Sequence, residues 1–224
     1  MNKFIKMIFM KKLRYFFLVI VFLSTTTIIA QSKADIKIKE LAKKMFVDMN
    51  NRDYESILDM SHPKLFEVAS REQIITNIKS MLEGNNDVKI EIPKTIPPYK
   101  VSKIFVKQKD SFAFVSYDLN MEMTFKNQSF IEETKKGMKA AMLSYGMEAE
   151  FTSDNSMKVI MNDRVTVLIK DKNTNEKWAM LNYDPSPMIS SLLPSEVIEA
   201  AKEYQNQLIK ERKEIQERKT NKSE

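Results

Sequence analysis

The chain contains one histidine, His62, which is the first side chain to consider for acid–base chemistry. A histidine that acts as a general base needs a partner and a pocket, and Asp53 and Asp59 lie near it in the sequence. A single histidine cannot build the usual multi-histidine zinc site. We favour the alternative that His62, which precedes Pro63, ends a helix and satisfies local hydrogen bonds, because the residue before a proline avoids the helical conformation.

Three polar residues, Asp118, Asn120 and Glu122, alternate along one predicted strand and therefore share a face. On a concave face, paired carboxylates could raise the pKa of one partner and create an acid/base pair. On a convex face they would simply be solvated. We favour the solvated alternative, because antiparallel sheets commonly expose one polar face.

Methionines are frequent in the predicted strands and in the helix inserted between them. The residues concerned are Met121, Met123, Met138, Met142, Met157 and Met161. Thioethers suit Cu(I), but residues i and i+2 of a strand share a buried face and methionine fills irregular gaps in a core. We therefore favour packing over metal binding. The functional use that we favour for these side chains is the lining of a lipophilic pocket.

Several kinds of catalytic site are missing from the sequence. The chain has no cysteine and only three glycines, so it has no cysteine nucleophile and no glycine-rich phosphate loop. The nucleophile-elbow, zinc-protease and EF-hand patterns are also absent. We expect no cofactor and no metal.

The elements that would position these residues begin with helices. Apolar residues between Ile38 and Met49 follow a helical period. Asp53 can cap a short second helix. Ser70 and Gln73 form a capping box for a third helix, which Gly84 would end.

The apolar period then changes to two, which predicts strands. The expected strands cover residues 88–92, 101–107, 112–125, 157–161, 164–170 and 178–183, with turns at 162–163 and 171–175. Residues 112–125 alternate along their length, so one face should be fully buried and the other apolar at one end only.

Two more helices complete the prediction. A capping box at Ser129 and Glu132 should open a helix that ends near Gly146, with a stripe of Ile131, Met138, Met142 and Tyr145. A proline-containing linker over residues 185–194 then leads to a helix that Ser195 can cap, and this helix should be solvated after Ile209.

The first 30 residues predict a signal peptide. A basic segment precedes a nine-residue apolar run at 15–23, and Ala30 before Gln31 suits cleavage. A membrane anchor would need about 20 apolar residues, so we favour cleavage, with Met1 or Met10 as the start. The mature chain would be periplasmic or extracellular, with no membrane association after cleavage.

The formal net charge of +6 belongs mostly to this segment. Its five basic residues leave 31 basic and 30 acidic side chains in the remainder. A nucleic-acid-binding protein needs a basic excess to replace counterions, so we expect no nucleic-acid partner.

Four short segments resemble the nuclear transport factor 2-like superfamily. They are residues 51–54 with Leu58, His62-Pro63 with Phe66, residues 70–73, and residues 175–178. The resemblance covers about residues 33–184. It implies an α+β fold in which three N-terminal helices pack on a curved antiparallel sheet, a cone with a pocket at its open end.

The helix at 129–146 departs from the family pattern as an insertion, and the helix at 195–219 as an appendage. The expected divisions are therefore a signal peptide at 1–30, a domain at 31–193 and a charged tail at 194–224.

The superfamily includes ketosteroid isomerase-like and polyketide cyclase-like enzymes as well as ligand-binding and dimerising modules, so the fold does not choose among them. In the enzymes a tyrosine and acidic residues inside the cone move a proton, which draws attention to Tyr54 and Asp53; the alternative is that Asp53 is a cap and Tyr54 a partly buried aromatic.

Our first hypothesis is a non-catalytic exported module that binds a small apolar ligand or a protein partner. The expected pocket residues are Tyr54, His62, Phe112, Phe114, Tyr117 and Trp178. The second hypothesis is an isomerase- or hydrolase-like enzyme that uses Tyr54 or His62 with a strand carboxylate. The third is a structural module of the cell envelope, which forms a homodimer through the sheet or docks to an envelope protein through the helix at 195–219.

Overall fold

The computed structural model of the chain describes residues 34–220. The expected signal peptide and its cleavage site at Ala30–Gln31 lie outside the described residues. The chain divides after residue 40, and the description that follows concerns the part from residue 41 onward. One helix covers residues 34–51, which agrees with the apolar spacing of that segment.

The N-terminal helical group follows the predicted capping pattern. Helix α2 spans Tyr54–Asp59, and the Asp53 side chain accepts a hydrogen bond from the backbone of Ser56. A short helix, α3, follows at Leu65–Val68. Helix α4 spans Arg71–Glu83, and its capping box between Ser70 and Gln73 is complete.

Gly84 ends α4 in a conformation that favours glycine, with φ of 83°. A Cβ at this position would lie 1.9 Å from the carbonyl oxygen of Val88. The prediction that Gly84 terminates the third helix is confirmed, and the close approach of the next strand is the physical reason.

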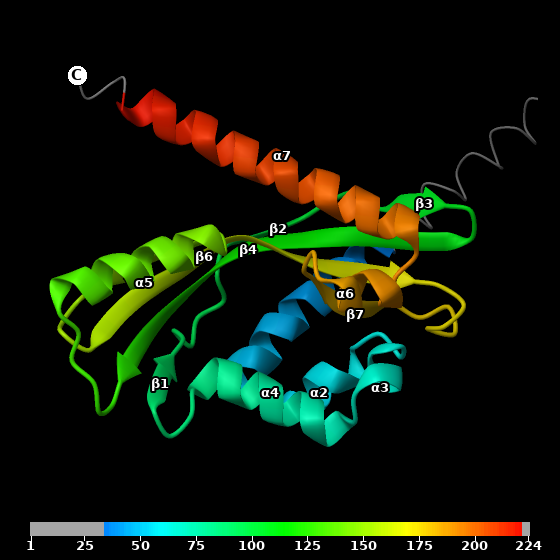
Figure 1. Cartoon of the computed structure of the whole chain (residues 1–224). Helices are drawn as coiled ribbons and strands as arrows, with labels where there is room; N and C mark the ends of the chain where they lie inside the picture. Colours follow the sequence, from blue (N-terminus) through cyan, green and yellow to red (C-terminus); the bar gives the residue numbers. More distant parts are fainter. Residues whose placement is uncertain (1–33, 221–224) are drawn as a thin grey trace, which may run out of the picture. The chain divides into compact units, whose positions relative to one another are not determined.

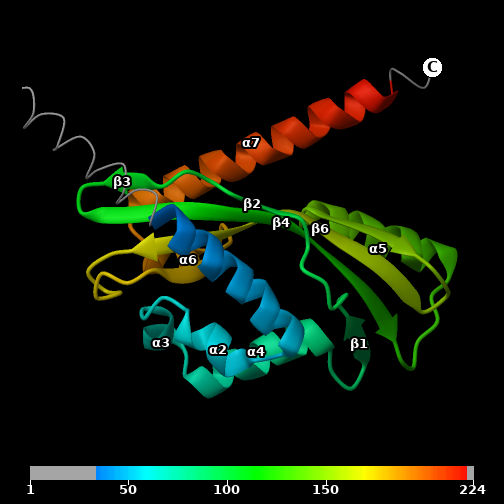
Figure 2. The same cartoon turned by 180° about the vertical axis from the view of Figure 1, so that it is seen from behind.

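The sheet is curved, unclosed and antiparallel (Figures 1 and 2). Its seven strands are β1 (Val88–Glu91), β2 (Tyr99–Val101), β3 (Phe105–Lys107), β4 (Asp110–Phe125), β5 (Met147–Phe151), β6 (Ser156–Lys170) and β7 (Ala179–Tyr183). They follow the order β1-β4-β6-β5, with β2 and β3 paired to β4 and β7 paired to β6. The predicted α+β class, with helices on a curved antiparallel sheet, is confirmed.

Three strand predictions need correction. The strand expected at 101–107 is two strands, β2 and β3, because residues 102–104 leave the ladder. The strands expected at 157–161 and 164–170 are one strand, β6, since residues 162–163 form an irregularity in its pairing with β4 and not a turn. Strand β5 was not predicted.

The helix predictions near the C-terminus also need correction. The expected linker at 185–194 contains helix α6 (Pro187–Leu192). Helix α5 (Glu132–Ser144) begins after Ile131, which makes no side-chain capping bond. The Ser129 capping box is therefore wrong, and so are the ends of the predicted stripe, because Ile131 and Tyr145 are 69% and 79% exposed.

Strand β4 carries two sets of side chains that face opposite sides of the sheet. Phe112 and Phe114 belong to a closed core with α6 and with the first half of helix α7 (Ser195–Thr220). Tyr117 faces the other side, where it makes an edge contact with Phe46 of the helix over 34–51. The helical group and α7 therefore cover opposite faces, as both views show (Figures 1 and 2).

Arg212 fixes α7 to the sheet where the pairing of β4 and β6 is irregular. Asp163, at φ of 53°, accepts two hydrogen bonds of 2.9 Å from its guanidinium. Asp118 accepts a third, of 2.5 Å. These hydrogen bonds raise the pKa of Arg212 above its usual range, although burial opposes them. The ion pairs thus connect the exposed half of α7 with the irregularity (a β-bulge) in the pairing of β4 and β6.

Candidate functional site

Cross-strand rows of apolar side chains lie at the end of the sheet formed by β1, β4, β6 and β5. Met157 of β6 lies opposite Met123 of β4 and opposite Phe151 of β5. Met161 lies opposite Leu119 on one side and Met147 on the other. Directly opposed residues of antiparallel strands have their Cβ atoms about 4.5–5.5 Å apart, so these rows form one continuous apolar surface.

Helices add side chains to the same surface, which we call the methionine face. Its members are Leu82, Ile92, Met121, Met157 and Val159, which are buried, and Met49, Tyr54, Ile78, Ile90, Leu119, Met123, Phe125, Met138, Met142, Met147, Ala149, Phe151 and Met161, which are partly buried. Eight of the 16 methionines of the chain are in this set. The helix over 34–51, α2, α4 and α5 all supply members, so four separate helices border the face.

The methionine face is far less closed than the core on the other side of the sheet. Of its 18 side chains, five are buried and 13 partly buried, whereas the core beneath α7 has 12 buried and six partly buried. The same kind of apolar surface is therefore largely sealed in one place and only partly covered in the other. Apolar surface that a protein leaves partly accessible commonly serves for binding.

Helix α5 rests lightly on this face. Met138 and Met142 pack against it, but α5 has no fully buried residue. Phe130, just before the helix, makes edge contacts with Phe125 and Phe151. The helix is thus connected to the face by two flexible side chains and an aromatic cluster at its start.

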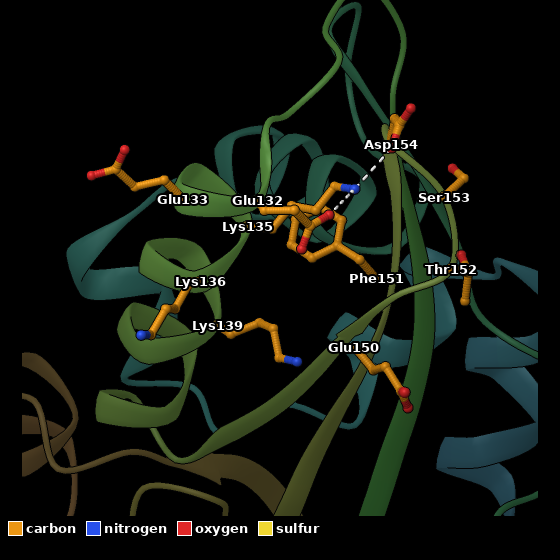
Figure 3. A pocket seen from close by; sticks show the side chains of 10 residues that line it. All are labelled: Glu132, Glu133, Lys135, Lys136, Lys139, Glu150, Phe151, Thr152, Ser153 and Asp154. Atoms are coloured by element: carbon orange, nitrogen blue, oxygen red, sulfur yellow. Dashed lines mark hydrogen bonds and ion pairs between the residues drawn. The ribbon is translucent and has the colours of Figure 1, made fainter.

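A pocket of about 780 Å³ lies between α5 and β5 (Figure 3). Its walls carry mostly charged side chains, together with Phe151, which also belongs to the methionine face. Lys135 donates hydrogen bonds to Glu132 at 2.9 Å and to Asp154 at 2.8 Å. The pocket therefore borders the apolar surface and has a polar wall.

Tyr54, predicted as a pocket residue, lies at the edge of the methionine face. Its hydroxyl donates a hydrogen bond to the carboxylate of Glu83. Burial, this hydrogen bond and the charge of Glu83 raise the pKa of Tyr54 to about 12, while Arg52 opposes the shift. The phenol therefore stays protonated near neutral pH and its proton is already engaged, which disfavours a role as general base.

His62 is fully buried, with 0% exposure, and its partner is Asp171, 109 residues away. The backbone N–H of Lys64 donates to Nδ1, which places the imidazole proton on Nε2, 3.2 Å from Asp171. Asp53 and Asp59 do not face it, because Asp53 caps α2 and Asp59 pairs with Arg71.

Asp171 organises the turn between β6 and β7. Burial alone would raise its pKa, but hydrogen bonds from Asn173, the Thr174 backbone and His62 outweigh burial and lower the pKa. The adjoining backbone of His62 donates to Met180 of β7 at 2.9 Å. The His–Asp pair is therefore a buried connection between the helical group and β7, away from solvent.

A second pocket, of about 720 Å³, lies outside this connection and includes Asp171 among its lining residues. Asp110, on its wall, has a pKa raised by burial and by the charges of Asp171, Glu176 and Glu196. Lys64, Lys109 and Lys172 balance the acids of the wall in number. We assign no chemistry to this mixed surface.

The remaining predicted pocket residues are not gathered at one site. Phe112 and Phe114 are sealed in the core beneath α7, Tyr117 contacts Phe46 on the opposite face, and Trp178 is half-buried just before β7. Neither pocket is lined by any of the six predicted residues. Of the six, the structure places only Tyr54 on the methionine face.

The strand carboxylates do not form an acid/base pair. Asp118 binds Arg212 and the backbone of Asp163, Asn120 is exposed, and Glu122 lies opposite Lys158. Among residues 34–220, no group of three or more histidine, aspartate or glutamate side chains converges to hold a metal ion. The six methionines singled out from the sequence all belong to the methionine face, and its other two, Met49 and Met147, lie in elements with no pattern specific to a site.

No protein-family model, curated protein or solved structure matches the chain significantly. In the described part of the chain, no helix has the length and apolar character needed to cross a bilayer.

Proposed function

We propose that this chain is a non-catalytic exported module that binds a small, flexible apolar ligand on the methionine face. The observation that carries the proposal is the half-burial of 13 of the 18 apolar side chains there. Each methylene group that such a ligand transfers from water onto this surface contributes about 0.8 kcal/mol. The methionine face therefore offers a surface for binding a ligand and not a set of reactive groups.

Methionine suits this role because its side chain adapts to ligands of different shape. It is unbranched, has three rotatable bonds and carries a polarisable sulfur. Met147 and Met161 lie opposite each other on β5 and β6, and Met138 and Met142 lie one helical turn apart on α5. The flexible chain of a ligand that enters between these methionines would contact side chains that can change their rotamers at low energetic cost.

The buried state of His62 and the engaged proton of Tyr54 support binding over catalysis. A catalytic base must come within hydrogen-bond reach of the proton it removes, and His62 has no exposed surface. The curved sheet with a helical group on one face supports the proposed relation to the nuclear transport factor 2-like superfamily. Export to the periplasm or beyond, through the leader at 1–30, is part of the same proposal.

Titration with a neutral apolar fluorophore such as N-phenyl-1-naphthylamine tests the proposal. We expect saturable enhancement at one site per chain, with a dissociation constant on the order of 1–100 µM, because the open face shields only part of a ligand. Met147→Lys places a charge on the face at the edge strand, and it should weaken binding at least about tenfold.

The matched control is Val106→Lys on β3, since Val106 is 66% exposed and outside the face. It should bind as the unchanged protein does, and circular dichroism should show both variants folded. Equal binding by the two folded variants, or no saturable binding by the unchanged protein, would refute the proposal. Native mass spectrometry of protein from its own host would identify a ligand that co-purifies.

A further inference from the structure

The methionine face ends at a charged wall, and both are built partly from α5. Met138 and Met142 pack on the face, while Lys135 and Lys139 line the neighbouring pocket. Phe151 belongs to both surfaces. A ligand lying along the face therefore reaches the pocket where it passes Phe151.

Lys135 is not available to a ligand. Its ammonium group is bound by Glu132 and Asp154 and lies 5.7 Å from the centre of the Phe151 ring. The two hydrogen bonds raise its pKa. One ammonium group faces two carboxylates, so this trio leaves no positive charge free for a ligand.

Lys139 differs from Lys135 although it lies one helical turn further along α5. Figure 3 shows its ammonium group directed into the space between α5 and β5, while Lys136 points away from that space. No hydrogen bond or ion pair connects Lys139 to another residue within 34–220, and Glu150, on the opposite wall, turns its carboxylate away (Figure 3). Lys139 is therefore a cation without a partner at the end of an apolar surface.

We infer that the ligand of the methionine face is amphipathic, with an anionic group such as a carboxylate that binds Lys139 while its apolar chain lies on the methionines. This inference rests on the proposed function. A carboxylate at the end of an alkyl chain can accept a charge-assisted hydrogen bond from the ammonium group. The chain supplies most of the affinity, and the anionic end fixes the direction in which the ligand lies.

The test compares a long-chain fatty acid with the alcohol of the same length, by displacement of N-phenyl-1-naphthylamine. Both probes should displace the fluorophore, and the acid should bind about two- to fivefold more tightly, the range of one solvent-exposed ion pair. Lys139→Gln should abolish that preference and leave the affinity for the alcohol unchanged. Lys136→Gln is the matched control and should preserve the preference.

The outcomes separate this inference from the proposed function. If acid and alcohol bind equally to the unchanged protein, or if Lys139→Gln and Lys136→Gln reduce the preference by the same factor, the inference is wrong and the apolar site stands. If neither probe displaces the fluorophore, both proposals fail. Raising the salt concentration should weaken the acid selectively, because exposed charges are screened.

Discussion

Removal of the Asp171 carboxylate should destabilise the protein strongly without any effect on a catalytic step. Its oxygens accept hydrogen bonds from the backbone of Asn173 and of Thr174, both at 2.9 Å, from the Asn173 side chain at 3.0 Å, and from His62 at 3.2 Å. Asp171→Ala leaves the His62 and Thr174 donors buried and unsatisfied. At about 1–3 kcal/mol for each such donor, we expect a loss of about 3–4 kcal/mol in the free energy of unfolding.

The assay is urea denaturation at pH 7 followed by circular dichroism, with the slope m unchanged between variants. Asp171→Asn keeps one acceptor oxygen for the turn and should lose about half as much. Asp59→Ala is the control: this carboxylate pairs with Arg71 but is 71% exposed, so its loss should stay below about 1 kcal/mol. A loss below about 1 kcal/mol for Asp171→Ala would refute the reasoning.

The same pair predicts a pH dependence with a definite sign. The pKa of Asp171 is lowered in the folded state, so the folded protein binds a proton there less readily than the unfolded chain does. The stabilisation is therefore complete well above the unfolded pKa of about 3.9 and is lost as the pH falls from there through the lower folded pKa. The stability gap between the unchanged protein and Asp171→Asn should narrow only over that acidic range.

Three further predictions concern the frame of the site. Arg212→Ala removes the ion pairs that hold α7 on the sheet, and because the Arg212 side chain is one-third exposed, the free energy of unfolding should fall by about 1–2 kcal/mol. Hydrogen exchange over residues 205–212 should accelerate, and unchanged exchange would contradict the role of these ion pairs in holding α7. Gly84→Ala would force a Cβ to 1.9 Å from the Val88 carbonyl oxygen, so we expect a loss of at least about 3 kcal/mol in thermal unfolding; a near-neutral variant would show that the close approach is wrong. Ser70→Ala breaks the capping box of α4 and should cost about 1 kcal/mol in urea, whereas no change would mean that the cap is unimportant.

Local patterns predicted three helices of the helical group, because their boundaries depend on neighbouring residues, whereas the short helix α3 was not predicted. Asp53, the Ser70–Gln73 capping box and Gly84 act within a few positions of themselves, and all three are confirmed. The long strand β4 was predictable for the same reason, since its alternation repeats over its length.

Long-range contacts explain the errors. Residues 162–163 resemble a turn, but Arg212, 49 residues further along, binds Asp163 and supports a bulge within one strand. Ser129 has a suitable capping sequence, yet Phe130 packs between Phe125 and Phe151, and the helix starts two residues later than the box would place it. Tertiary packing overrode local preference in both places.

The candidate site was only partly predictable. Strand β5 alternates Met147, Ala149 and Phe151 with two glutamates, but alanine and glutamate are also good helix formers, so its short pattern was ambiguous. The partner of His62 lies 109 residues away, and no spacing indicates it. The predicted aromatic pocket was dispersed because Phe112 and Phe114 face α7, which the sequence does not place.

Methyl-labelled methionine NMR tests the central claim most directly. With ¹³C-methyl methionine, titration of a neutral apolar ligand should shift the resonances of the methionine face, including Met123, Met147 and Met161. Met81 and Met188, which are 49% and 52% exposed outside the face, should stay unchanged. Shifts confined to Met81 and Met188, or no shifts at saturating ligand, would contradict the account.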